Sequence, residues 1–322
     1  MRFRNAFLLL LENFKNVYKI LLYKLIVALV CTAIYCALIL PELNVIFTSA
    51  EWLALKEDGL ALLATFMPTA TQSQFTEVRN RLAETTLPAF AQMVLGQTAG
   101  IVVRAVCCVL VYLLQRFVDT VCYFTVGSVL NDRMATYGDT PFFKAYLLNL
   151  SKSAKYSLVY VPIVFLFDLA SIVVCIAVFE LVNLFYAPFL CVSAIALCQT
   201  LKLTFTSHWM PRMVTDDCTL RGAMRGYEKT EKKHLSKVFS TNLSAVFCII
   251  ALNVLALLFT AGSALLLTVP ASYLFLLCLQ FVNYYTVKGK KYFITYDNIS
   301  THSSFGDTAE FFKAVEEEER SE

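Results

Sequence analysis

Three charged residues stand within stretches of the chain that are otherwise almost entirely apolar. Arg116 and Asp119 lie in LLQRFVDTV, and Asp168 lies in VFLFDLASIV. A charged side chain at the centre of a bilayer costs about 2.5–3.5 kcal/mol on insertion scales, so such residues usually face protein or water. Two roles fit them: an ion pair that fixes helix register, or a polar cavity that binds an anion or carries protons.

The spacing of these residues predicts which of them meet. Arg116 and Asp168 each lie about midway along a predicted membrane span, and the two spans are consecutive. We therefore expect Arg116 to pair with Asp168 near the bilayer midplane. Asp119 lies one turn further toward the cytoplasm on the same helix face as Arg116. A sealed ion pair is the leading interpretation of this cluster, and a functional cavity is the alternative.

The composition indicates that these residues are embedded in lipid. Of the 322 residues, 58% are hydrophobic and 16% are charged, and the mean hydropathy is +0.64. A soluble domain carries roughly 25% charged residues. The chain therefore belongs to the class of integral membrane proteins.

A spanning helix needs about 20 mostly apolar residues. The apolar runs predict six spans, at 20–41, 105–131, 157–180, 187–206, 240–262 and 265–286. Residues 42–87 are expected to form one large outer loop with short polar helices, and 88–103 an outer extension or re-entrant segment. Together these make a membrane domain over residues 1–291, followed by an acidic cytoplasmic tail at 292–322.

The basic residues predict the orientation. They cluster at Arg2, Arg4, Lys15, Lys19 and Lys24, and again within 133–155, 212–237 and 288–291. By the positive-inside rule, six spans with both termini in the cytoplasm place all of these clusters inside. Amphipathic lead-ins at 3–19, 140–156 and 219–237 each precede a pair of spans. The predicted fold is an all-α membrane bundle of three hairpins, each preceded by a cytoplasmic amphipathic helix, in a plasma (inner) membrane of bacterial type.

The third lead-in, TLRGAMRGYEKTEKKHLSK, is the most polar of the three. A Lys or Arg near an anionic leaflet contributes about 1 kcal/mol of attraction, so this segment is expected to lie on membrane lipids. The alternative is a docking surface for a cytoplasmic protein. Charge alone gives no support for nucleic-acid binding. The residues concerned are Arg221, Arg225, Lys229, Lys232, Lys233 and Lys237.

Motifs that would indicate catalysis or cofactor binding are missing from the sequence. There is no P-loop, no G-x-G-x-x-G, no H-E-x-x-H and no G-x-S-x-G. The three histidines, His208, His234 and His302, lie near or beyond the predicted membrane edges, and the sequence has no C-x-x-C pair. We therefore expect a non-enzymatic protein with no metal and no cofactor.

The stretch NDRMATYGDTPFFKAYLLNLSKSAKYSLVYV, residues 131–161, resembles a segment of YesL-like bacterial membrane proteins. In these proteins a span ends in a short charged link, and a surface helix leads into the next span. The layout of residues 105–290 is also similar to the membrane domain of some glycerophosphodiester phosphodiesterases. The resemblance implies an accessory of carbohydrate uptake and carries over no site residue. The outer loop at 42–87 and the acidic tail depart from this pattern.

Three functions are weighed, of which a membrane-embedded enzyme ranks last because the sequence nominates neither a nucleophile nor a base. The first is an accessory or scaffold of a membrane complex, with the charges sealed as a pair. The second is a secondary transporter or channel, with a continuous polar cavity that reaches Asp168. Lys202 is expected to extend to the membrane interface, and Asn253, Gln280 and Asn283 to hydrogen-bond between helices. The oligomeric state and the substrate stay open at this point.

Overall fold

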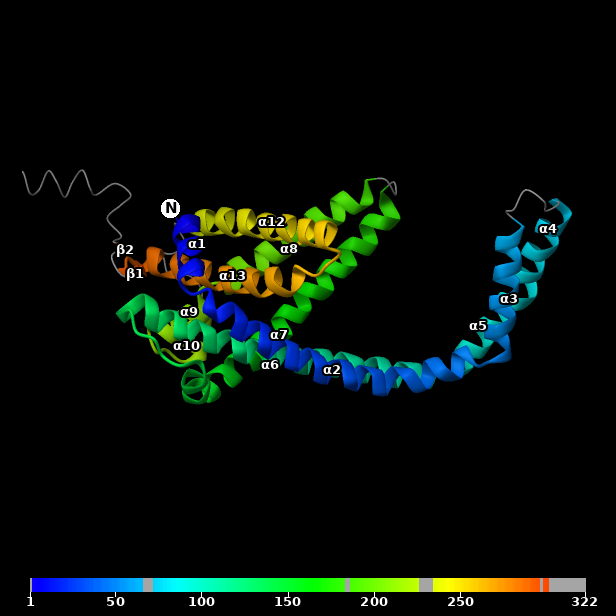
Figure 1. Ribbon diagram of the computed structural model, residues 1–322, viewed down its shortest axis with the longest axis horizontal. Helices are drawn as coiled ribbons and strands as arrows, with labels where there is room; N and C mark the ends of the chain where they lie inside the picture. The colour runs from blue at the N-terminus through cyan, green and yellow to red at the C-terminus, as the bar shows by residue number, and fades with distance from the viewer. Residues whose placement is uncertain (1, 66–71, 183–185, 226–233, 296–297, 301–322) are drawn as a thin grey trace, which may run out of the picture. The chain divides into compact units, whose positions relative to one another are not determined.

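The computed structural model describes residues 2–65, 72–182, 186–225, 234–295 and 298–300. Over these residues the protein is almost entirely α-helical (Figure 1). A short antiparallel pair of strands, β1 (Tyr292–Thr295) and β2 (Asn298–Ser300), follows the last helix. Most of the predicted acidic tail, residues 301–322, lies outside the described residues.

Within the described residues, six helical segments are long and apolar enough to cross a bilayer, so the chain is a multi-pass membrane protein. The predicted spans fall within them, except that the fifth helix ends at Thr260, before the predicted 262. The segments are α2 (Lys15–Phe47), α6 (Thr98–Thr136), α7 (Phe142–Leu181), α8 (Ala187–Thr206) with α9 (Trp209–Thr215), α12 (Leu235–Thr260) and α13 (Leu265–Lys288).

The ends of the last two spanning helices follow from local backbone geometry. Beyond Thr260, Ala261 and Gly262 both adopt positive φ, which stops α12 and turns the chain into α13. Gly289, with φ 68°, caps the end of α13 in the left-handed conformation that glycine adopts without strain. These turns fix the lengths of the two helices that line one side of the cavity described below.

The described chain divides into two compact units. One contains the residues up to Ile26 and those from Arg116 onward, and the other contains residues 27–115. In the first unit α7 packs against α8, α8 against α12, and α12 against α13 (Figure 1). The separate N-terminal helix α1 (Arg2–Glu12) packs against α13 and β1.

Helix α13 is the most buried spanning helix of this unit. Leu274, Leu277 and Phe281 are completely buried there, together with Phe124 of α6. Gly127 lets α6 approach closely, because a Cβ atom at this position would lie 2.8 Å from Met210 Sδ and 3.2 Å from the ring of Phe281. Close packing of this kind holds helices together in lipid, where the hydrophobic effect offers little.

The outward faces of the spanning helices are apolar. Leu166 of α7, Phe189 of α8 and Phe259 of α12 are 62%, 70% and 82% exposed, respectively. Contiguous exposed apolar surface of this kind is rare on soluble monomers and indicates a partner or a membrane. Here it agrees with lipid contact along the spans.

Polar contacts gather the ends of several helices at one end of the first unit. Arg133 and the Tyr137 hydroxyl both donate hydrogen bonds to Glu12 Oε1, at 2.8 and 2.7 Å, and these bonds lower the pKa of Glu12. Lys15 pairs with Asp139 at 2.6 Å. The N-terminal helix, the end of α6 and the start of α7 therefore lie at the same end, which is the end predicted to be cytoplasmic.

The predicted lead-in helices take different forms in the structure. The first is α1, which is separated from α2 by a turn at residues 13–14. The second is not a separate helix, because residues 142–156 are continuous with the span in α7. Of the third, the structure describes α10 (Leu220–Met224) and the start of α12, while residues 226–233 lie outside the described residues.

The second unit contains the segment predicted to be an outer loop. It holds α3 (Ala50–Ala64), α4 (Gln72–Arg81), the π-helical turn η1 (Leu82–Thr86) and α5 (Leu87–Gly96), which pack on one another. Residues 88–103 are divided between α5 and the first turns of α6, with a break at Gln97. Within this unit Glu42 of α2 pairs with Arg104 of α6.

Candidate functional site

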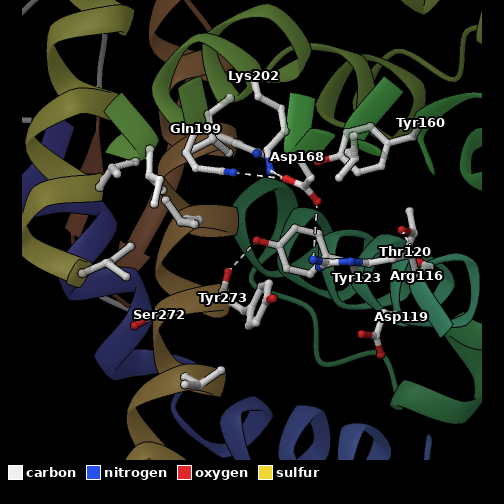
Figure 2. A pocket seen from close by; sticks show the side chains of 18 of the residues that line it. Arg116, Asp119, Thr120, Tyr123, Tyr160, Asp168, Gln199, Lys202, Ser272 and Tyr273 are labelled. Carbon is white, nitrogen blue, oxygen red and sulfur yellow. Dashed lines mark hydrogen bonds and ion pairs between the residues drawn. The ribbon is translucent and has the colours of Figure 1, made fainter. Parts of the chain in front are cut away.

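A cavity of about 460 Å³ lies among the spanning helices of the first unit (Figure 2). Its walls come from α2, α6, α7, α8, α12 and α13. All three charged residues singled out in the sequence, Arg116, Asp119 and Asp168, line it. The cavity also contains two cations that the sequence did not connect to this cluster, Lys24 and Lys202.

Asp168 is surrounded by donors from two other helices. Its Oδ2 lies 3.5 Å from Arg116 Nη2, and its Oδ1 lies 3.6 Å from Lys202 Nζ. The side-chain amide of Gln199 donates a hydrogen bond to the same Oδ1 at 3.2 Å. The structure therefore brings Arg116 and Asp168 together, and places a second cation on the same carboxylate (Figure 2).

Asp119 lies apart from this group and belongs to a second ion pair. Its Oδ2 is 3.6 Å from Lys24 Nζ of α2. The ammonium group of Lys24 also lies 3.5 Å from the ring centroid of Tyr273, which is a cation–π geometry. Asp119 Oδ1 is buried and accepts no hydrogen bond from the described part of the chain.

The expectation that Lys202 extends to the membrane interface is wrong. Its side chain is 12% exposed and turned toward Asp168 inside the bundle. Asp168 lies about as far before the end of α7 as Gln199 and Lys202 lie after the start of α8. Because consecutive spans run antiparallel and α7 packs on α8, this symmetry puts the three side chains at one depth. Counting residues outward from the α7–α8 connection in both directions predicts from the sequence that Asp168, Gln199 and Lys202 meet.

Tyrosines hold the helices around the cavity. The hydroxyl of Tyr123 on α6 donates a hydrogen bond to the backbone carbonyl of Tyr273 on α13, at 2.7 Å, and their rings make an edge contact. Tyr160 of α7 stacks on Tyr156, with ring centroids 5.0 Å apart, and lines the cavity as well. The Tyr123–Tyr273 contact joins α6, which carries Arg116 and Asp119, to α13, whereas the Tyr156–Tyr160 stack lies within α7.

Of the residues expected to hydrogen-bond between helices, Asn253 and Asn283 do so. The Thr268 hydroxyl donates to Asn253 Oδ1 at 2.8 Å, and Asn253 Nδ2 donates to the Ser272 hydroxyl at 3.4 Å. Asn283 Oδ1 accepts a bond of 3.5 Å from Arg2, which ties the N-terminal helix to α13. Gln280 of α13 lines the cavity.

Of the basic residues proposed as a docking surface, the three that the structure describes do not line the cavity. Arg221, Arg225 and Lys237 are exposed on or beside α10 and α12. Lys229, Lys232 and Lys233 lie outside the described residues. Within the part of the chain that the structure describes, no group of three or more His, Cys, Asp or Glu side chains has the arrangement needed to hold a metal ion.

No protein-family model, curated protein or solved structure matches this chain. The resemblance of residues 131–161 to YesL-like proteins therefore stays a prediction from the sequence.

Proposed function

We propose that this chain is a secondary transporter of small anions and that the charged cavity is its binding site. The observation that carries the proposal is the excess of cations among the charged cavity residues. Lys24, Arg116 and Lys202 face two carboxylates, Asp119 and Asp168, inside a cavity of about 460 Å³ formed by spanning helices.

The charge excess favours an anion over a cation or a proton as the cargo. Charges within a membrane protein are expensive unless they are paired or hydrated, and they commonly mark substrate pathways. Three cations and two carboxylates line the cavity, so the charged lining residues carry a net charge of +1. A bound anion would balance that charge. A cation or proton site would need the opposite balance.

The distances around Asp168 support a site that exchanges partners. Charge-assisted hydrogen bonds between an ammonium or guanidinium group and a carboxylate are usually about 2.7–2.9 Å long. The contacts of Asp168 with Arg116 and Lys202, at 3.5 and 3.6 Å, are longer. We infer that Asp168 acts as an internal competitor, which orients both cations when the cavity is empty and gives way to a substrate anion.

We place this activity in the plasma (inner) membrane of a bacterial-type cell, with both termini in the cytoplasm. Support comes from the basic clusters before the first span and in the segments after α6, α8 and α13. The six candidate spans among the described residues form an even number, which agrees with this orientation.

The test is uptake of labelled butane-1-sulfonate into proteoliposomes that contain the purified protein. A sulfonate stays ionised at all working pH values, so it does not cross the bilayer as a neutral acid. We expect saturable uptake that is lost in Lys202→Gln and retained in Lys237→Gln, whose lysine is exposed outside the cavity. Uptake equal to that of empty liposomes for butane-1-sulfonate, nitrate and lactate would contradict the proposal.

A second function, an accessory or scaffold of a membrane complex, is favoured by one observation. Arg221, Arg225 and Lys237 are exposed at the end of the bundle predicted to be cytoplasmic and are available to a partner or an anionic leaflet. Cross-linking of the tagged protein in its own host, followed by mass spectrometry, tests this function. A stoichiometric partner linked through Lys237 supports it, and a protein recovered alone favours transport.

A further inference from the structure

The cavity has two chemically different sides. Its charged residues come from α2, α6, α7 and α8, and none of the residues that α12 and α13 contribute to the lining is charged. Figure 2 shows Arg116, Asp119, Asp168 and Lys202 gathered on helices other than α12 and α13. The aliphatic residues on α12 and α13 are Val246, Ile249, Ile250, Val269 and Leu276.

Several polar groups on the α12–α13 side already have partners within the protein. Asn253 is hydrogen-bonded to Thr268 and Ser272, so its amide serves to join α12 and α13. The carbonyl of Tyr273 accepts from Tyr123. Apart from Gln280 and the side chain of Tyr273, this wall therefore presents aliphatic surface to whatever occupies the cavity.

The size and lining of the cavity match a small molecule better than a bare ion. Pockets for small molecules have volumes of about 300–1,000 Å³ and are mostly apolar, with a few convergent polar groups that fix orientation. An inorganic anion would contact the cations and leave the aliphatic wall against water, which is unfavourable. A molecule with an acidic group at one end and an apolar body fills both sides.

We propose that the ligand of this cavity is an organic monoanion with an apolar body, such as an alkyl or aryl carboxylate or sulfonate. Its acidic group lies between Arg116 and Lys202, and its body lies against α12 and α13. The single excess positive charge favours one negative charge over two. This inference rests on the proposed anion site and adds the class of substrate.

The experiment is a calorimetric titration of the protein in nanodiscs with 1-alkanesulfonates, from methane- to decanesulfonate, with empty nanodiscs subtracted. Burying one CH₂ group contributes about 0.8 kcal/mol, so each added methylene should tighten binding about fourfold until the cavity is filled. Sulfate, a dianion without an apolar body, should bind more weakly than butanesulfonate. Butan-1-ol, which lacks the charge, should not bind measurably.

Two matched variants of α12 locate the apolar contact. Val246→Thr places a hydroxyl in the aliphatic wall with little change of volume. It should reduce the gain in alkanesulfonate affinity that each added methylene gives. Val254→Thr makes the same change on the same helix at a residue that is 47% exposed and does not line the cavity, so the gain should persist.

The outcomes separate this inference from the proposed function. Binding that is equal along the series overturns the apolar ligand class while the anion site stands. If none of these anions binds, the proposed function fails as well. If the gain in affinity per methylene ends near hexanesulfonate, the ligand is a water-soluble anion. If the gain continues to decanesulfonate, the ligand is an amphiphile that enters from the bilayer.

Discussion

Asp58 and Asp168 are both helical carboxylates that pair with an arginine, but their surroundings differ. Asp58, in the unit of residues 27–115, is 8% exposed and accepts hydrogen bonds from Arg81 Nε at 2.8 Å and from the Thr86 hydroxyl at 2.5 Å. Asp168, in the other unit, has its donors at 3.2–3.6 Å and lines a cavity. We call the Asp58 pair closed, because its bonds are short and it is buried, and the Asp168 pair open, because its contacts are longer and it lines a cavity.

The difference separates a structural ion pair from a candidate binding site. Both oxygens of Asp58 have short bonds, so nothing is gained by exchanging its partners. The cations around Asp168 are held at a longer distance beside space that a ligand can enter. The geometry around a charged residue in a membrane protein is therefore more informative about its role than the presence of a partner.

The largest expected effect is on anion binding when an arginine is removed. Arg116→Gln should weaken butane-1-sulfonate binding about 10- to 100-fold, because a hydrogen bond to a charged group contributes about 1.5–3 kcal/mol. Arg81→Gln removes the arginine of the closed pair and should leave the affinity unchanged. Calorimetric titration of both variants checks this, and equal losses would remove the distinction between the two pairs.

A smaller effect of opposite sign on anion affinity is expected when Asp168, the proposed internal competitor, is changed. Asp168→Asn removes a negative charge that faces Arg116 and Lys202, so butane-1-sulfonate should bind about tenfold tighter. Release should slow, and uptake into proteoliposomes should fall. Because two cations then lack their carboxylate, the thermal stability of the variant should depend on the anion concentration. Unchanged or weaker binding would show that Asp168 does not compete.

The corresponding change at the closed pair should affect only local structure. Asp58→Asn weakens the bonds that join α3 to Arg81 and to η1. Peptides from residues 50–64 and 82–86 should exchange their amide hydrogens faster, as measured by mass spectrometry, while anion binding stays the same. A change in butane-1-sulfonate affinity would contradict the structural role of Asp58.

The smallest expected effect is a dependence on acid pH. The hydrogen bond from Thr86 and the contact with Arg81 lower the pKa of Asp58 below its ordinary value. A carboxyl group whose pKa is lowered by folding adds stability above its unfolded pKa, about 3.9, and loses it as the pH falls through the lowered value. Peptic cleavage near α3 should increase below about pH 4 in the wild type and vary less with pH in Asp58→Asn.

Much of the helical architecture could be predicted from the sequence, because the bilayer demands long apolar helices and composition reveals them. The meeting of Arg116 with Asp168 followed from their positions within consecutive spans. Lys202 was misjudged because a lysine near a span end usually extends outward, and the α7–α8 register was not applied. Lys24 was counted only as a determinant of orientation, although the structure pairs it with Asp119.

Other features had no signal in the sequence. The π-helical turn at Leu82–Thr86 packs against α3, α4 and α5, and no periodic pattern in the sequence marks it. The bonds of Asp58 reach Arg81 and Thr86, which lie on later elements, and no periodic pattern links these positions. The existence of a cavity was a stated alternative, but its size depends on six helices at once.

The most direct test of the account is a titration of butane-1-sulfonate into wild-type protein, Lys202→Gln and Lys237→Gln in nanodiscs. We expect one saturable site in the wild type and in Lys237→Gln, and a loss of at least tenfold in affinity in Lys202→Gln. Equal binding by all three proteins, or binding by none, would contradict the claim that the cavity around Asp168 is an anion site.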